Sequence, residues 1–357
     1  MTDWTNQQTF ANALERAETQ EKGNCFEDFS EGQTIEHAPG LVLSQHANEL
    51  WMSQTLNHDP IYWRSDAARA VGYENPPVHP DYLIASVMGP SVEDLSEKGG
   101  YFLGRDDVSL HDPTVTPGIE IRVESTVEAT RESSSRPDYG IVTWQTGGFD
   151  AETGDLLLSY TRTNMIPRRE PMATDGGSET PGESRPATET DGSGLPSEFV
   201  PPSGPYFEDF RDALERTADR DATVAYRHER GRTMDDMMVA TLPLLTLNTA
   251  KQHHNDHYMA DTPSGEIVAY GDVTRSVALG HARSDERTYR EIGYGDERFH
   301  DFVTVGDTIY GFTRVLDTEE TGDPEAGKVT FKHYAFNQHD EPVYSGTRTA
   351  AVQKRNR

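Results

Sequence analysis

Apolar and polar residues alternate over several segments of the chain and predict β-strands. Residues 118–124, GIEIRVE, place an apolar side chain at every second position, as a strand with one buried face requires. Similar segments lie at 139–145, 156–165, 308–315, 328–336 and 343–352. The predicted strands therefore fall into two groups, one in each half of the chain.

Each half also contains two segments that favour helices. Residues 47–56 and 234–247 are amphipathic, and each leads into a polar, His-rich region. An apolar segment rich in small residues follows, at 81–88 and at 272–279. This order of elements predicts an α+β fold in which an antiparallel sheet wraps around one buried helix, twice over.

Short words of sequence recur in the same order in the two halves. They are FEDF at 26–29 and 207–210, Thr-Leu-Asn at 55–57 and 246–248, Val-Thr-x-Gly at 115–118 and 303–306, and Thr-Arg-Thr at 161–163 and 347–349. Ordered matches at a nearly constant offset indicate an internal repeat.

The segment 168–205 separates the two copies. It is nearly devoid of large apolar residues and rich in Gly, Ser, Thr, Pro and acidic residues, so burial could not offset the entropy of ordering it. We predict a first domain at 1–167, a flexible acidic linker at 168–205 and a second domain at 206–357.

The chain is strongly acidic, which indicates the surroundings in which it works. Acidic residues number 61 against 32 basic ones, for a formal net charge of −29, and only six of the basic residues are lysine. Nucleic acid and anionic membranes would be repelled, so neither is an expected partner. Molar salt, in which the Debye length is roughly 3 Å, would screen the self-repulsion. We therefore predict adaptation to a salt-rich cytoplasm.

Cysteine content and hydropathy agree with that location. Cys25 is the single cysteine, so no intramolecular disulfide can form, and the N-terminus lacks the pattern of a secretion signal. No apolar run approaches the roughly 20 residues that a membrane span needs.

At this point the sequence resembles a known family. Residues 55–83, TLNHDPIYWRSDAARAVGYENPPVHPDYL, resemble the hydratase motif of MaoC-like hot-dog proteins, Asp-x-Asn-Pro-x-His followed by a helix and a His-Gly turn. Residues 247–280, LNTAKQHHNDHYMADTPSGEIVAYGDVTRSVALG, resemble the C-terminal half of mesaconyl-CoA hydratases. The resemblance implies a double hot-dog fold, a CoA-thioester substrate and no cofactor, and it allows a homo-oligomer. It also implies reversible hydration of mesaconyl-CoA to β-methylmalyl-CoA, a step of the methylaspartate cycle in haloarchaea.

A constant offset of 191 pairs the candidate site residues of the two halves. The pairs are Asn57 with Asn248, Tyr62 with His253, His79 with Tyr270 and Pro80 with Gly271. In the family, a His takes the proton of the attacking water, and a backbone N–H at the start of the central helix stabilises the enolate. Tyrosine is a poor base at neutral pH, and proline has no N–H. The second half is therefore predicted to catalyse, through His253 and Gly271, and the first half to form the tunnel for the pantetheine arm.

One position departs from the family pattern. Asn248 stands where the family has its catalytic Asp, and an amide cannot act as a general base. We expect Asn248 either to orient the water or to cap a helix C-terminus. Asp256 and Asp272 are the candidate carboxylates that would orient His253.

Further residues are candidates for binding the charged substrate. They are Lys251, Tyr270, Asp272 and Arg275. A metal site made of His253, His254 and His257 is not favoured, because the zinc-protease motif requires Glu directly after the first His. Two other functions stay open. A thioesterase would need a carboxylate base at the mouth of the central helix, and a non-catalytic acyl-CoA binding module would not need His253.

Overall fold

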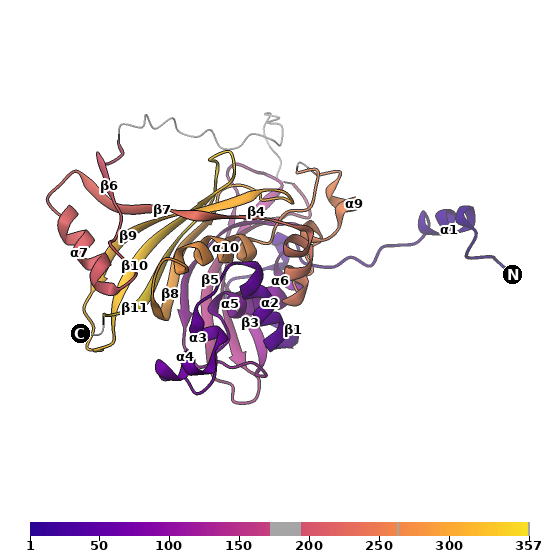
Figure 1. Ribbon diagram of the computed structural model, residues 1–357. Helices are drawn as coiled ribbons and strands as arrows, with labels where there is room; N and C mark the ends of the chain where they lie inside the picture. The colour runs from indigo at the N-terminus through magenta and orange to yellow at the C-terminus, as the bar shows by residue number, and fades with distance from the viewer. Residues whose placement is uncertain (172–193, 263, 356–357) are drawn as a thin grey trace.

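The two groups of strands join into one continuous sheet. The computed structural model describes residues 1–171, 194–262 and 264–355, in which eleven strands form a sheet in the order β1-β3-β4-β5-β2-β8-β11-β10-β9-β7-β6 (Figure 1). The first five are β1 (Thr34–Val42), β3 (Glu120–Glu132), β4 (Tyr139–Asp150), β5 (Leu156–Pro167) and β2 (Tyr101–Leu110). The others are β8 (Thr288–Phe299), β11 (Pro342–Gln353), β10 (Ala326–Phe336), β9 (Thr308–Glu319), β7 (Ala222–Thr233) and β6 (Glu198–Val200).

The halves meet edge to edge at β2 and β8. These strands run antiparallel, with Arg105 opposite Glu297 and Val108 opposite Tyr294. The pairing leaves no free strand edge between the two copies. All ladders of the sheet are antiparallel except the parallel pairing of β6 with β7. The predicted α+β double hot-dog architecture is confirmed, as one sheet rather than two separate ones.

Each half wraps its part of the sheet around one buried helix. The central helices are α5 (Pro80–Met88) and α10 (Gly271–Arg283), and nearly every residue in them is buried. Both begin where the sequence predicts them. The fixed φ of Pro80 suits the first helical position, where its missing N–H costs nothing.

Two glycines at equivalent positions let the halves approach closely. A Cβ on Gly89, just after α5, would lie 1.6 Å from the Thr246 carbonyl oxygen, and one on Gly280, within α10, would lie 2.1 Å from the Thr55 oxygen. Each central helix therefore packs against the Thr-Leu-Asn turn of the other half. The repeated words of sequence mark this reciprocal contact.

The Thr-Leu-Asn turns end the amphipathic helices that precede them. In the first half this helix is α2 (Gln45–Gln54), and in the second a π-helical turn (Met237–Thr241) continues into α8 (Leu242–Leu245). Leu56 and Leu247 both adopt a left-handed φ of 62°. The following N–H groups close the turns, that of Asn57 on Met52 O at 2.9 Å and that of Asn248 on Pro243 O at 3.1 Å.

Shorter elements complete the chain. They are α1 (Gln7–Leu14), α3 (Pro60–Trp63), α4 (Ser65–Ala70), α6 (Val92–Leu95), α7 (Phe207–Thr217) and α9 (Asp256–Met259), with 3₁₀ turns at Phe26–Asp28, Gly89–Ser91 and Lys251–His253. Of the predicted linker, residues 172–193 lie outside the described residues, whereas Glu198–Val200 form β6. No helix among the described residues is long and apolar enough to cross a membrane.

Candidate active site

His253 is the buried imidazole of the second half. It ends the 3₁₀ turn Lys251–His253 and is only 4% exposed. Its Nδ1 lies 2.8 Å from the Val268 carbonyl oxygen. A carbonyl can only accept, so Nδ1 carries the proton and Nε2 keeps its lone pair. Burial lowers the pKa of His253 to about 4, which keeps the ring neutral and able to accept a proton at pH 7.

Gly271 opens the central helix beside this imidazole. At the first position of an α-helix the N–H has no acceptor within the helix, and it lies at the positive end of the helix dipole. A Cβ at Gly271 would lie 2.9 Å from the ring of Phe299. Glycine is therefore required here by close packing, and its N–H can bind a developing negative charge.

Tyr270 connects the two groups. It is the N-cap residue of α10, and its ring lies 5.5 Å from that of His253 and 6.5 Å from that of Trp51, centroid to centroid. Its hydroxyl is buried and has no hydrogen-bond partner within the described residues. Burial, and then the nearby charge of Asp272, raise the pKa of Tyr270 well above its ordinary value, so the hydroxyl remains a donor.

Asn248 both closes a helix and orders the catalytic turn. Its backbone N–H makes the helix-ending bond to Pro243 described above, and its side-chain Oδ1 accepts from the Ala250 N–H at 3.1 Å. The predicted capping role is thus present. Its side-chain amide nitrogen is the group that could orient a water.

Lys251 is exposed and begins the 3₁₀ turn that ends at His253. Its ammonium is 5.3 Å from the ring centroid of Tyr258, and it is the one lysine of the six that has no ion pair with a described residue. It lines an open cavity of about 510 Å³ together with Asn255, His257, Tyr258, Asp261 and Thr262. A cation in such a cavity, on so acidic a chain, can bind an anionic group of a ligand.

Arg275 and Asp272, which are candidates for binding the substrate, form ion pairs inside the protein. Both side chains are fully buried. Arg275 Nη1 lies 2.5 Å from Asp81 Oδ1, and its Nε pairs with Glu297. Arg105 holds Asp272 through Nη2 at 2.5 Å and Nη1 at 3.2 Å. These charges are satisfied within the protein, because isolated charges are too costly to bury.

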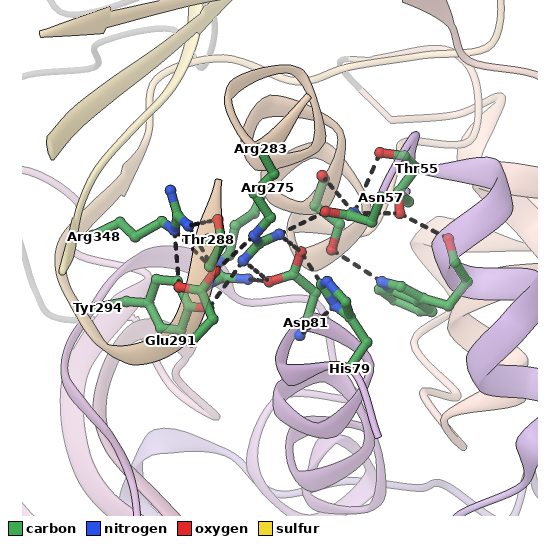
Figure 2. Close-up of polar contacts among 12 residues, drawn as sticks. Thr55, Asn57, His79, Asp81, Arg275, Arg283, Thr288, Glu291, Tyr294 and Arg348 are labelled. Carbon is green, nitrogen blue, oxygen red and sulfur yellow. Dashed lines mark hydrogen bonds and ion pairs between the residues drawn. The ribbon is translucent and has the colours of Figure 1, made fainter. Parts of the chain in front are cut away.

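These residues belong to a larger buried ion network that the sequence did not reveal, and Figure 2 shows the part of it around Asp81 and Glu291. Asp81 binds Arg283 as well as Arg275, and although burial opposes it, these two arginines lower the pKa of Asp81. Glu291 lies 2.9 Å from Arg283 and 2.8 Å from Arg348. Despite its burial, Arg348 and Arg283 lower the pKa of Glu291 to about 2. Because each pair joins residues far apart in the chain, spacing gives no signal for them.

The remaining polar candidates of the second half lie apart from the chemistry. Asp256 begins α9 and is exposed, so it does not orient His253. His254 is exposed and contacts the Thr249 carbonyl oxygen through Nε2 at 3.0 Å, and His257 is exposed too. The three neighbouring histidines therefore do not converge on one point.

The equivalent place in the first half holds different side chains. Tyr62 lies edge-on to His79, with ring centroids 4.5 Å apart. His79 Nδ1 accepts from the Asp81 N–H at 3.2 Å and so caps α5, and burial lowers the pKa of His79 to about 3. The cavity between Tyr62 and Pro80 has a volume of about 20 Å³, which is room for about one water.

Comparisons with known proteins point to one family. The family model for mesaconyl-CoA hydratase matches residues 3–354. A mesaconyl-CoA hydratase of Haloarcula marismortui is 63% identical over 99% of both chains, and one of Haloarcula hispanica is 62% identical over the same shares. A putative MaoC domain dehydratase from Chloroflexus aurantiacus has a TM-score of 0.78 at 20% identity, covering 95% of this chain and 100% of its own.

Fold and site together define a MaoC-like double hot-dog protein. The match of the family model and the identity to the haloarchaeal relatives go further. The chain belongs to the mesaconyl-CoA hydratase family, and it is a hydro-lyase.

Proposed function

We propose that the protein catalyses the reversible hydration of mesaconyl-CoA to β-methylmalyl-CoA at a single site in its second half. The observation that carries the proposal is the difference between the two copies. A neutral, buried imidazole and a free helix-start N–H occur together at His253 and Gly271, whereas Tyr62 and Pro80 occupy the same places in the first half. The reaction named for the relatives requires those two groups.

The proton balance follows from the state of His253. Nε2 removes a proton from water as the oxygen attacks the β-carbon, and the electrons of the double bond move onto the thioester oxygen. The Gly271 N–H donates to that oxygen, which stabilises the enolate. The imidazolium then returns its proton to the α-carbon, so the ring is neutral again. No cofactor is required for this sequence.

The neighbouring groups would orient the reactants. Asn248 supports the turn that carries His253, and its amide nitrogen would hold the water. The Tyr270 hydroxyl, without a partner among the described residues, would donate to an oxygen of the acyl group. Lys251 would pair with an anionic group of CoA at the open cavity that it lines.

The geometry favours hydration over thioester hydrolysis. Hydrolysis in hot-dog proteins uses a carboxylate base near the start of the central helix. The carboxylate that follows Gly271 is Asp272, and Arg105 already holds both of its oxygens. We therefore assign the role of base at this helix start to His253.

The test is to incubate the purified protein with mesaconyl-CoA and to follow two signals. Loss of the enoyl absorbance reports hydration, and a thiol reagent reports release of free CoA. We expect the absorbance to fall without release of thiol. Crotonyl-CoA serves as a comparison enoyl-CoA that has no free carboxylate. Release of thiol at the same rate as the loss of absorbance would instead support a thioesterase, and no change in either signal a binding module.

The composition also supports a setting. We propose that the enzyme works in a salt-rich cytoplasm. Its net charge of −29, with only six lysines, produces a self-repulsion that salt would screen. The two Haloarcula relatives are consistent with this.

A further inference from the structure

The two central helices are held by charges from opposite halves of the molecule. Asp81 and Asp272 occupy the same position, the second residue of α5 and of α10. Asp81 binds Arg275 and Arg283, which both lie on α10 of the second half. Asp272 binds Arg105, which lies on β2 of the first half. The ion pairs therefore cross the boundary between the copies in both directions.

Glu297 on β8 links the two sets of ion pairs. Its Oε2 lies 2.7 Å from Arg105 Nε, its Oε1 pairs with Arg275 Nε, and the Tyr344 hydroxyl donates to Oε1 at 2.8 Å. A continuous chain of contacts thus runs from Asp272 through Arg105, Glu297 and Arg275 to Asp81. All five of these charged side chains are fully buried.

We propose that Arg105 is a positioning residue for the reaction in the second half. Asp272 follows Gly271 directly, and Arg105 holds both oxygens of its carboxylate at the first turn of α10. Arg105 thereby fixes the direction in which the Gly271 N–H points. This inference rests on the proposed function, because the N–H matters only if it stabilises an enolate.

The geometry excludes direct contact of Arg105 with a substrate. Its guanidinium is bound on the Nε, Nη1 and Nη2 sides by Glu297 and Asp272, and it lies 5.4 Å from the ring centroid of Tyr160. It has no exposed surface with which to touch a substrate. Buried ion pairs add little net stability, because desolvation offsets much of their Coulomb energy. What such a pair supplies is fixed geometry.

The first half is then part of the catalytic apparatus without reacting itself. Tyr62 and Pro80 stand in it where the second half has His253 and Gly271, yet its Arg105 and Asp81 hold the helix that bears the donor. This explains why Asp81 is present beside Tyr62 and Pro80 although no chemistry requires it there.

The test compares Arg105→Lys with Arg348→Lys. Lysine keeps the charge but cannot hold both oxygens of Asp272 as the planar guanidinium does. Arg348 is equally buried and belongs to the same network, but it binds Glu286 and Glu291 and reaches α10 only through its last residue, Arg283. It is therefore a matched control for loss of a buried guanidinium.

We expect Arg105→Lys to lower kcat for mesaconyl-CoA by about 10²-fold, with KM changed by less than about threefold, because small misplacements of a catalytic group have effects of this size. Arg348→Lys should change kcat much less, even where it lowers the thermal midpoint as much. Hydrogen exchange supplies a readout that needs no turnover: amides at the start of α10 should exchange faster in Arg105→Lys than in Arg348→Lys.

Two results would overturn the inference. One is a folded Arg105→Lys enzyme with normal turnover, and the other is an equal fall of kcat and equal exchange at α10 in both variants. Failure of the proposed function would look different. The wild-type protein would then be inactive with mesaconyl-CoA, and the hydrogen-exchange comparison of the two variants could still be made.

Discussion

The proposal that only the second half reacts depends on single side chains. The imidazole of His253 is buried and neutral, with the proton on Nδ1 and a lone pair on Nε2, which lies 3.4 Å from the Gln252 amide nitrogen, whereas Tyr62 in the same place keeps its proton. Burial raises the pKa of Tyr62 well above its ordinary value. The same physical cause, desolvation, favours the neutral form of both groups, and only the imidazole is a base in that form.

The pH dependence of the reaction should report the depressed pKa of His253. Because burial lowers that pKa to about 4, the base is neutral well below pH 6. We expect kcat/KM to stay nearly constant as the pH falls from 7 to about 5, and to fall below that as the imidazole is protonated. Circular dichroism at each pH would confirm that the protein is folded. A loss of activity centred on pH 6.5, the ordinary value, would contradict the assignment.

Lys251 should contribute to binding of CoA rather than to turnover. We expect Lys251→Gln to raise KM for mesaconyl-CoA about tenfold, the equivalent of roughly 1.4 kcal/mol. The N-acetylcysteamine thioester, which lacks the nucleotide, should react equally well with both forms. Lys328→Gln is the control, since Lys328 is already paired with Glu319. An equal effect on both thioesters would assign Lys251 to the acyl end instead.

How well the sequence predicted each strand depended on what the strand buries. Strand β10 alternates regularly, and alternation predicted it. Strand β8 buries one residue in three, namely Thr288, Glu291, Tyr294 and Glu297. Its register against β11 is irregular. Two of these buried residues are acidic and appear in the sequence as surface positions. Hydrophobic patterning therefore did not predict β8, which contributes Glu291 and Glu297 to the ion network. It did not predict the network either.

The candidate site was predicted only in part, for a related reason. Comparing the two halves identified His253 and Gly271, because a base and an N–H are properties of the residue type. Whether Arg275 and Asp272 meet a substrate depends on partners 194 and 167 residues away, Asp81 and Arg105. Such contacts are set by the fold and not by local spacing.

The contact of each central helix with the opposite turn should be intolerant of a methyl group. We expect Gly280→Ala to destabilise the protein by about 1–3 kcal/mol, because its Cβ would lie 2.1 Å from the backbone oxygen of Thr55. Gly322→Ala is the control, since a Cβ there has no atom within 4 Å. Thermal unfolding followed by circular dichroism measures the difference. Equal midpoints for the two variants would contradict the close packing.

Charge is distributed unevenly over the whole molecule. The network of buried ion pairs contains four arginines and five carboxylates, namely Arg105, Arg275, Arg283 and Arg348 with Asp81, Asp272, Glu286, Glu291 and Glu297. The network itself is thus nearly balanced and contributes little to the net charge of −29. Salt should act on the surface and leave the buried pairs little affected.

Stability should therefore depend strongly on ionic strength. We expect the thermal midpoint to fall when KCl is lowered from molar concentration to about 0.1 M, where the Debye length grows to roughly 10 Å and the surface carboxylates repel one another. A series of melting curves followed by circular dichroism measures this. A midpoint independent of salt would contradict the adaptation to a salt-rich cytoplasm.

The most direct test of the account is the turnover of two matched variants with mesaconyl-CoA, His253→Ala and Tyr62→Phe. These positions are equivalent in the two halves, and both side chains are buried. We predict that His253→Ala lowers kcat by about 10²-fold or more, as expected for removal of a general base, and that Tyr62→Phe leaves kcat nearly unchanged. A folded His253→Ala enzyme with normal turnover, or a Tyr62→Phe enzyme that still binds CoA but no longer hydrates, would contradict a single site in the second half.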